Sequence, residues 1–217
     1  MTDALTRPAT SDRPGASGPA TSDRLATGRP GELVHATLDP ALGMIEVFVL
    51  DPDAHLDVIH SWVTQPRAKF WGLGELSRQE LRDLYAYVDG LATHHAFLVF
   101  RDGTPVVLLQ TYEPEHDPVG ECYPVEPGDV GLHFFIGDRG APIDAFTTRI
   151  SRVLGDFLFA SPGAGRIVVE PDVNNDGAVT RMTLMGFEPG PVITLPNKQG
   201  RLAFMPRERW ERMPLAR

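Results

Sequence analysis

The chain has 217 residues, 42% of them hydrophobic, and a mean hydropathy of −0.15, which fits a single domain with some tail. Acidic residues outnumber basic ones 29 to 20, the formal net charge is −9, and Lys and Arg form no cluster, so we expect no nucleic-acid partner. The sequence has no apolar run of about 18 residues, no secretory pattern and only one cysteine, Cys122, so we expect a cytoplasmic chain without membrane contact.

Residues 1–32 differ in composition from the rest of the chain. They are rich in Pro, Gly, Ser, Thr and Ala, and they repeat the motif ATSDR at 9–13 and 20–24. Such a segment buries too little apolar area to offset the entropy lost on ordering. We therefore predict a disordered low-complexity tail over 1–32, in which the repeat is alternatively a docking motif, and a folded domain over 33–217.

Periodicity and turn residues predict the elements of this domain. Ser77-Arg-Gln-Glu is a capping box that begins a helix, and Asp102-Gly103 between two β-branched and aromatic runs indicates a hairpin. In chain order we expect a strand at 43–50, helices at 51–66 and 77–90, a hairpin at 96–114, a strand from 129, a helix from 142, a strand at 166–172, a helix at 175–186 and two terminal strands around a turn at 197–200.

The stretch DVGLHFFIGDRGAP (129–142) carries a histidine inside an otherwise apolar strand. Alternation places Gly131, His133, Phe135 and Gly137 on one face. A titratable ring near two glycines indicates a strand that leaves room for something other than protein. A core histidine with satisfied ring nitrogens is the alternative.

The predicted order, with a mixed sheet and a glycine turn between the fourth strand and the third helix, resembles the GNAT acyltransferase fold, an α/β fold with a mixed sheet in three α/β/α layers. Three stretches narrow the resemblance to the branch that makes hydroxamate siderophores, with its aerobactin, desferrioxamine and mycobactin types: HSWVTQPRAKFWGL (60–73), DVGLHFFIGDRG (129–140) and VVEPDVNNDGAVTRMTLMGF (168–187). The resemblance implies an enzyme of iron acquisition that transfers an acyl group from acetyl-CoA or succinyl-CoA to an N-hydroxylated lysine, ornithine or diamine such as N-hydroxycadaverine. We expect a monomer or homodimer.

The turn GDRGAP at 137–142 is the candidate coenzyme A site. Gly137 and Gly140 let the backbone approach a ligand, and unpaired amides at a helix start favour an anion such as pyrophosphate. Asp138 and Arg139 lie in the same turn, and Arg139 adds a positive charge. The stretch departs from the commoner GNAT pattern Gln/Arg-x-x-Gly-x-Gly/Ala, and a turn without a ligand is the alternative.

The resemblance implies that His133 and Asp172 lie at the acceptor nitrogen. Imidazole titrates in the range a general base needs. Asp172 follows a buried strand and Pro171, where it would accept a hydrogen bond from the N-hydroxy group or orient His133; alternatively it caps the segment at 173–176. Asn175 matches an asparagine near the pantetheine arm and serves equally as an N-cap. Trp71 is a candidate wall of the acceptor cleft or a core residue.

Other kinds of site find less support. Four histidines have no partner at metal-ligand spacing, so we expect no metal: His60, His94, His95 and His116. The sequence has no Gly-x-Ser-x-Gly elbow, and Cys122 has no evident base, which favours direct transfer over an acyl-enzyme. Two further functions stay open. One is a malonyl-CoA-decarboxylating acetyltransferase on the same scaffold, and the other is a non-catalytic acyl-CoA-binding module in which His133 is idle.

Overall fold

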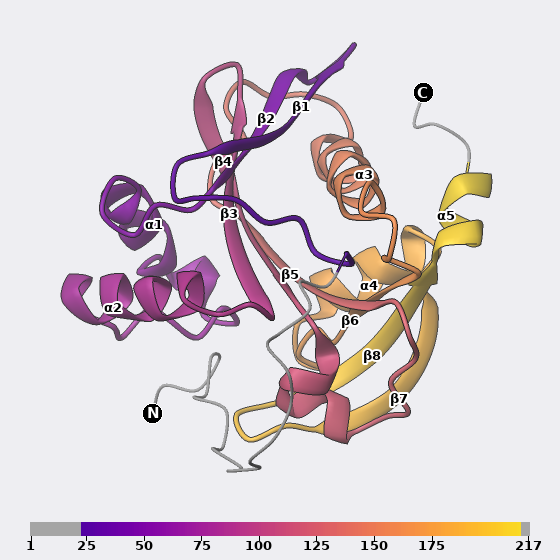
Figure 1. The fold of residues 1–217 in the computed structure, drawn as a ribbon. Helices are drawn as coiled ribbons and strands as arrows, with labels where there is room; N and C mark the ends of the chain where they lie inside the picture. The colour runs from indigo at the N-terminus through magenta and orange to yellow at the C-terminus, as the bar shows by residue number, and fades with distance from the viewer. Residues whose placement is uncertain (1–22, 214–217) are drawn as a thin grey trace.

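The computed structural model describes residues 23–213 (Figure 1). Within this range the helices, including short 3₁₀ turns labelled η, and strands follow in the order β1 Leu33–Asp39, β2 Gly43–Val49, α1 Leu56–Val63, η1 Pro66–Ala68, α2 Arg78–Asp89, β3 His94–Arg101, β4 Thr104–Tyr112, η2 Pro114–His116, η3 Pro118–Glu121, β5 Asp129–Ile136, α3 Phe146–Phe159, β6 Arg166–Val169, α4 Asp176–Leu184, β7 Glu188–Thr194, β8 Gln199–Pro206 and α5 Arg207–Arg212.

The strands of the described range form one mixed eight-stranded sheet in the order β1-β2-β3-β4-β5-β6-β8-β7. Helices α1 and α2 lie on one face, and α3 and α4 lie on the other (Figure 1). Each face has its own apolar core. One core joins α1 and α2 to the sheet, and the other joins the sheet to α3 and reaches α4 and α5. The predicted three-layer α/β/α arrangement is confirmed.

Two local sequence signals produce the expected geometry. The Ser77 hydroxyl and the Glu80 carboxylate form the reciprocal capping box of α2, which ends at Gly90. Asp102 and Gly103 both have positive φ, at 48° and 77°, as a tight hairpin turn between β3 and β4 requires.

The N-terminal boundary predicted at residue 33 is wrong for residues 23–32. Leu25 is buried in the core on the α3 face, and the Arg24 guanidinium pairs with the carboxylates of Glu113 at 3.1 Å and Glu115 at 2.6 Å. One leucine and one arginine therefore anchor a segment that is polar on average. The remainder of the predicted tail, residues 1–22, lies outside the described residues.

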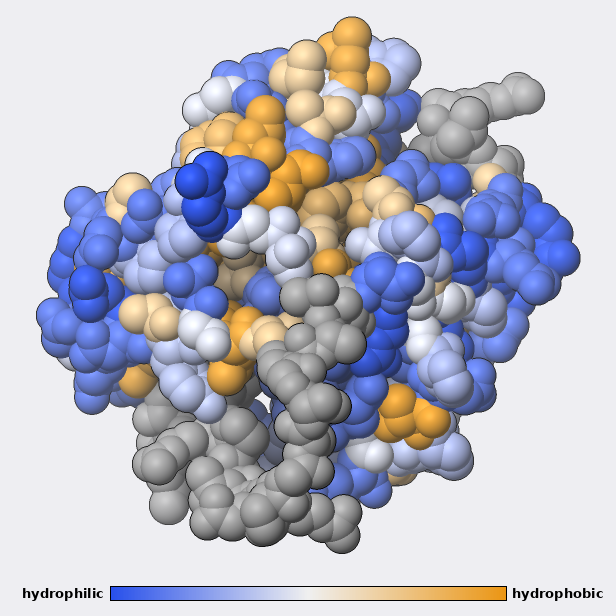
Figure 2. Space-filling view, viewed as in Figure 1, coloured by the Kyte–Doolittle hydropathy of each residue, from blue (hydrophilic) through white to orange (hydrophobic). Residues whose placement is uncertain are grey.

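Strand β1 was not predicted because it is an edge strand. It pairs only with β2, and its side chains are half-buried or exposed, so its alternation is weak. Figure 2 shows apolar side chains gathered toward the top of the molecule, where Figure 1 draws β1 and β2. Leu33 and Leu38 of β1 and Met44 of β2 are exposed. The rest of that face is mostly hydrophilic.

Two helices begin later than the sequence predicts. The Asp51 carboxylate accepts the amides of Asp53 and Ala54 in a turn, and α1 begins only at Leu56. Helix α3 begins at Phe146, after Ala145 adopts a left-handed conformation with φ 57°. The turn at 137–142 consequently lies several residues before the helix and does not form its N-terminus.

Gly131 in β5 and Gly137 directly after it have a different use from the one predicted. A Cβ atom on Gly131 would lie 2.2 Å from the Tyr112 ring, and one on Gly137 would lie 1.9 Å from the Trp62 ring. Aromatic side chains of the protein itself therefore occupy the space beside both glycines.

Strands β5 and β6 form the parallel pair of this sheet, and their pairing is short. Asp129 to Gly131 pair with Arg166 to Val168, after which the two strands part. From Leu132 to Ile136, β5 pairs with β4 along one edge, and its other edge faces an opening in the sheet. No helix among residues 23–213 has the length and apolar character needed to cross a membrane.

Candidate active site

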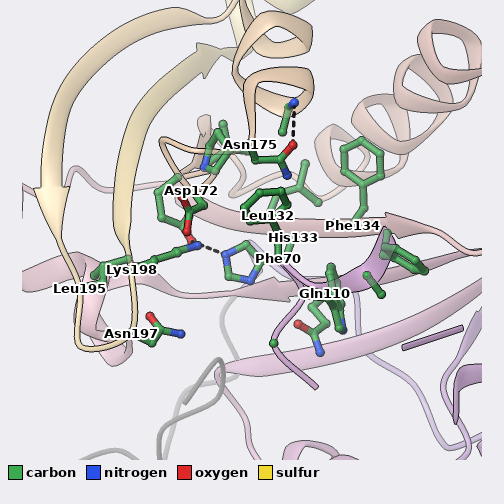
Figure 3. A pocket seen from close by; sticks show the side chains of 18 of the residues that line it. Phe70, Gln110, Leu132, His133, Phe134, Asp172, Asn175, Leu195, Asn197 and Lys198 are labelled. Carbon is green, nitrogen blue, oxygen red and sulfur yellow. Dashed lines mark hydrogen bonds and ion pairs between the residues drawn. The ribbon is translucent and has the colours of Figure 1, made fainter. Parts of the chain in front are cut away.

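A cleft of about 360 Å³ opens where β5 and β6 part. Its walls come from the segment around η1, from β5, from the end of β6, from α4 and from the turn between β7 and β8 (Figure 3). His133, Asp172, Asn175 and Trp71, which the sequence analysis singled out, all line this cleft. The structure thus brings the predicted acceptor-site residues to one place.

His133 projects into the cleft from β5 and is bound to a carboxylate that the sequence analysis did not select. Its Nε2 atom contacts Oε1 of Glu170, the residue directly after β6. The His133 side chain is 28% exposed, whereas that of Glu170 is 2% exposed. Because an ionised carboxylate only accepts hydrogen bonds, a neutral His133 carries its proton on Nε2 and leaves Nδ1 able to take one.

Glu170 is a buried anion with three partners. Besides His133, the Lys198 ammonium lies 3.1 Å from Oε1, and the Tyr112 hydroxyl donates to Oε2 at 2.9 Å. Burial by itself raises the pKa of the Glu170 carboxyl, but the charges and hydrogen bonds of a protonated His133 and of Lys198 outweigh it and bring the pKa to about 2. Burial and the Glu170 charge raise the pKa of Tyr112, so its hydroxyl keeps the proton that it donates.

Asp172 does not orient His133, and Glu170 does so in its place. The Asp172 carboxylate turns back to its own segment, where it accepts the backbone amide of Asn174 at 2.7 Å and the side-chain amide of Asn174 at 2.9 Å. This is the local capping arrangement that the sequence left open as an alternative. Asp172 still lines the cleft, so contact with an acceptor hydroxyl stays a prediction.

Trp71 and Asn175 line the cleft from separate segments of the chain. The Trp71 ring stands edge-on to His133 with centroids 6.5 Å apart, and it also packs against Phe135 at 5.8 Å. Asn175 caps α4 by accepting the amide of Ala178 at 3.2 Å. Trp71 is thus both a packing residue and a cleft wall, and Asn175 serves as the predicted N-cap.

The turn at 137–142 has its amides occupied in part. The Asp138 carboxylate accepts the amides of Arg139 at 2.6 Å and Gly140 at 2.9 Å, and these hydrogen bonds lower the pKa of Asp138. Gly140 has φ 63°, a conformation that suits glycine. Binding of pyrophosphate by these two amides would require the Asp138 carboxylate to release them.

Two arginines from other elements hold this turn by its carbonyls. Arg67, in η1, donates to the carbonyls of Ile136 and Gly137, while Arg101 at the end of β3 donates to those of Arg139 and Ala141 at 2.9 and 3.2 Å. The turn therefore lies between two guanidinium groups. This positive surrounding favours an anionic ligand irrespective of the turn's own amides.

Sequence reasoning missed Glu170, Lys198 and Tyr112. The alternation of side chains along β5 and β6 could have indicated Glu170. Gly131 pairs with Val168, and His133 and Glu170 each lie two positions further on, so their side chains point to the same face of the sheet. Lys198 lies 28 residues from Glu170 in a turn whose position depends on the β7-β8 hairpin. No short motif marks it.

A group with metal-ligand geometry lies outside the cleft lining. Glu113, Glu115 and His116 bring ligand atoms within 4.8 Å of one another. Arg24 pairs with both carboxylates, so a cation of the protein already lies there. The absence of a metal site stays a prediction.

A parted mixed sheet with a histidine-carboxylate pair at the opening is an arrangement suited to acyl transfer. A family model described as an acetyltransferase (GNAT) domain matches residues 51–195. The chain belongs to this GNAT acetyltransferase family.

Three curated proteins are similar to the chain. Lysine N-acyltransferase MbtK of Mycobacterium sp. (strain MCS) is 29% identical over 151 residues, covering 67% of this chain and 62% of the relative. N(6)-hydroxylysine O-acetyltransferase of Escherichia coli is 27% identical over 82% of this chain and 58% of its own. N-hydroxyputrescine acetyltransferase of Acinetobacter baumannii is 25% identical, covering 71% and 74%. The chain thus spans less than two thirds of the first two relatives.

Solved structures share the fold. An uncharacterized protein from Bacillus halodurans superposes with a TM-score of 0.74 at 21% identity, over 82% of this chain and 94% of that one. Aminoglycoside acetyltransferase AAC(6′)-Ib in complex with coenzyme A superposes with a TM-score of 0.66 at 18% identity, over 77% and 98%.

Proposed function

We propose that this protein transfers an acyl group from acyl-CoA to the nitrogen of an N-hydroxylated amine on an aliphatic chain, giving a hydroxamate for siderophore synthesis. The observation that carries the proposal is the His133-Glu170 pair in a cleft at the opening of a GNAT sheet. Two of the similar proteins are named for hydroxylated amines, hydroxylysine and hydroxyputrescine, which supports this acceptor class.

In this proposal His133 acts as the general base. The acceptor nitrogen attacks the thioester carbonyl, a C–N bond forms, and the proton of that nitrogen passes to Nδ1 of His133. Breakage of the C–S bond releases coenzyme A as a thiolate, to which the imidazolium returns the proton. Glu170 holds Nε2–H and stabilises the imidazolium between these steps, as a carboxylate behind a catalytic histidine does. The nitrogen needs no prior deprotonation, because a hydroxylamine is far less basic than an alkylamine.

The residues present fit an acyl-CoA. The edge of β5 beyond Gly131 offers backbone groups free of β6, which suits an extended chain with amide groups. The turn at 137–142, flanked by Arg67 and Arg101, offers positive charge for phosphates. Arg139, Gly140 and Asn175 stay candidate contacts.

The product identifies the reaction. Purified protein is incubated with acetyl-CoA or succinyl-CoA and either N-hydroxycadaverine or N6-hydroxylysine, and the product is analysed by mass spectrometry and by its coloured ferric complex. We expect an N-acyl hydroxamate. An O-acyl ester, which lacks the bidentate iron-binding group, or free coenzyme A without acylated amine contradicts the proposal.

Replacement of Asp138 tests the coenzyme A turn. Asp138→Ala removes the carboxylate that occupies the Arg139 and Gly140 amides, together with one negative charge beside the proposed phosphates. We therefore expect coenzyme A to bind about 3- to 10-fold more tightly in calorimetric titration, corresponding to a gain of about 1 kcal/mol. Asp176→Ala, an exposed residue outside the cleft lining, is the control. Unchanged affinity in a folded Asp138 variant removes these amides from the site.

A further inference from the structure

Lys198 approaches the catalytic pair from a separate part of the sheet. It lies in the tight turn between β7 and β8, where the Leu195 amide donates to the Lys198 carbonyl at 2.8 Å. Its ammonium reaches Oε1 of Glu170, the same oxygen that binds His133. Figure 3 shows the Lys198 side chain pointing toward His133. The side chain is 19% exposed. A second contact fixes this approach, because the Val173 amide donates to the Gln199 carbonyl and ties the segment after Glu170 to the start of β8.

The shared oxygen links the charge of Lys198 to the proton of His133. A buried carboxylate needs a compensating positive charge. If His133 were the sole partner, Glu170 would favour imidazolium, and an imidazolium does not accept the acceptor's proton. Lys198 supplies the compensating charge, so that the carboxylate can stay ionised beside a neutral imidazole.

We infer that Lys198 is a positioning residue that keeps His133 in its neutral, basic form at physiological pH by neutralising Glu170. The inference rests on the proposed role of His133 as base. It makes Lys198 act on the base through Glu170 rather than through the substrate.

The other polar groups around His133 do not replace Lys198 in this role. From β4, Tyr112 is a protonated donor to Glu170, and Gln110 is neutral. The remaining charged groups of the cleft lie elsewhere on its lining. They are Arg67, committed to backbone carbonyls, Lys69, placed over the Phe70 ring, Asp117, which accepts the Val119 amide, and Asp172, which accepts from Asn174.

The dependence of kcat/KM on pH tests the inference. Lys198→Met removes one positive charge near the pair, so protonated His133 is favoured and the acidic limb of the profile moves up by about one pH unit. At pH 7 kcat/KM falls by up to about fivefold, the loss approaches tenfold at lower pH, and most of the activity returns by pH 9. The hydroxylamine's own ionisation affects all variants alike and cancels in the comparison.

Two further variants separate charge from hydrogen bonding. Lys198→Arg retains the charge and should keep the wild-type limb. Lys198→Gln retains a donor without charge and should follow Lys198→Met. An acidic limb that stays at the wild-type pH in the Met and Gln variants, or a loss of activity equal at all pH values, overturns the inference.

A readout without turnover separates this inference from the proposed function. The His133 imidazole is titrated by NMR in the wild type and the Lys198→Met and Lys198→Gln variants, with its signal assigned by its loss in His133→Asn. We expect the same upward shift of about one unit. A shift without any acyl transfer in the wild type leaves this inference standing and contradicts the proposed function. Transfer in the wild type with no shift in either folded variant contradicts this inference alone.

Discussion

His133→Ala should lower kcat for acyl transfer by roughly 10²- to 10⁴-fold, the range typical of losing a general base. The fold should persist, because Glu170 keeps Lys198 and Tyr112 as partners for its buried charge. The measurement is steady-state kinetics with acetyl-CoA and N-hydroxycadaverine, with thermal melting as a check on folding.

A second histidine provides the matched control for this variant. His116 is more than half exposed and does not line the cleft. His116→Ala should retain kcat within about twofold, the ordinary effect of a surface substitution. If the folded His133→Ala variant also retains kcat close to the wild-type value, His133 is not the base.

Glu170→Gln should lower kcat by roughly 10²- to 10³-fold with little change in the shape of the site. The amide is nearly isosteric, but it carries no charge to stabilise an imidazolium and can donate to Nε2, which favours the tautomer that places the proton on Nδ1. Lys198 also loses its anionic partner.

Comparison of kcat with KM distinguishes this effect from a general disturbance of the site. A tautomer and charge effect lowers kcat far more than it changes KM for the acyl-CoA. Asp176→Asn, the same chemical change at an exposed position in the first turn of α4, is the control. A Glu170 variant with unchanged kcat shows that the carboxylate behind His133 contributes nothing to the reaction.

Local signals predicted much of the fold. The capping box at Ser77, the positive-φ hairpin at Asp102 and the division of β5 side chains between the two cores all depend on residues within a few positions of one another, and the structure has each of them. The failures are at places where distant contacts decide. Leu25 orders a polar segment by entering the core, and Ala145 in a left-handed conformation delays α3.

The sequence predicted which residues line the candidate site, but it did not predict which carboxylate pairs with His133. His133, Asp172, Asn175 and Trp71 share one cleft, as expected. The carboxylate on His133 is Glu170, because residues at even spacing from a paired position share a face, and Asp172 is drawn to Asn174 beyond Pro171. Lys198 depends on where the β7-β8 hairpin places its turn, and no local pattern encodes that.

The central claim is selectivity for the N-hydroxylated acceptor, and the ratio of kcat/KM within matched pairs tests it most directly. The pairs are N-hydroxycadaverine with cadaverine and N6-hydroxylysine with lysine, each assayed with acetyl-CoA and succinyl-CoA at pH 7. A site that hydrogen-bonds the hydroxyl leaves polar groups unpaired when it is missing, so we predict a preference of at least about 10²-fold for the hydroxylated member of one pair. Equal kcat/KM within both pairs would contradict the account.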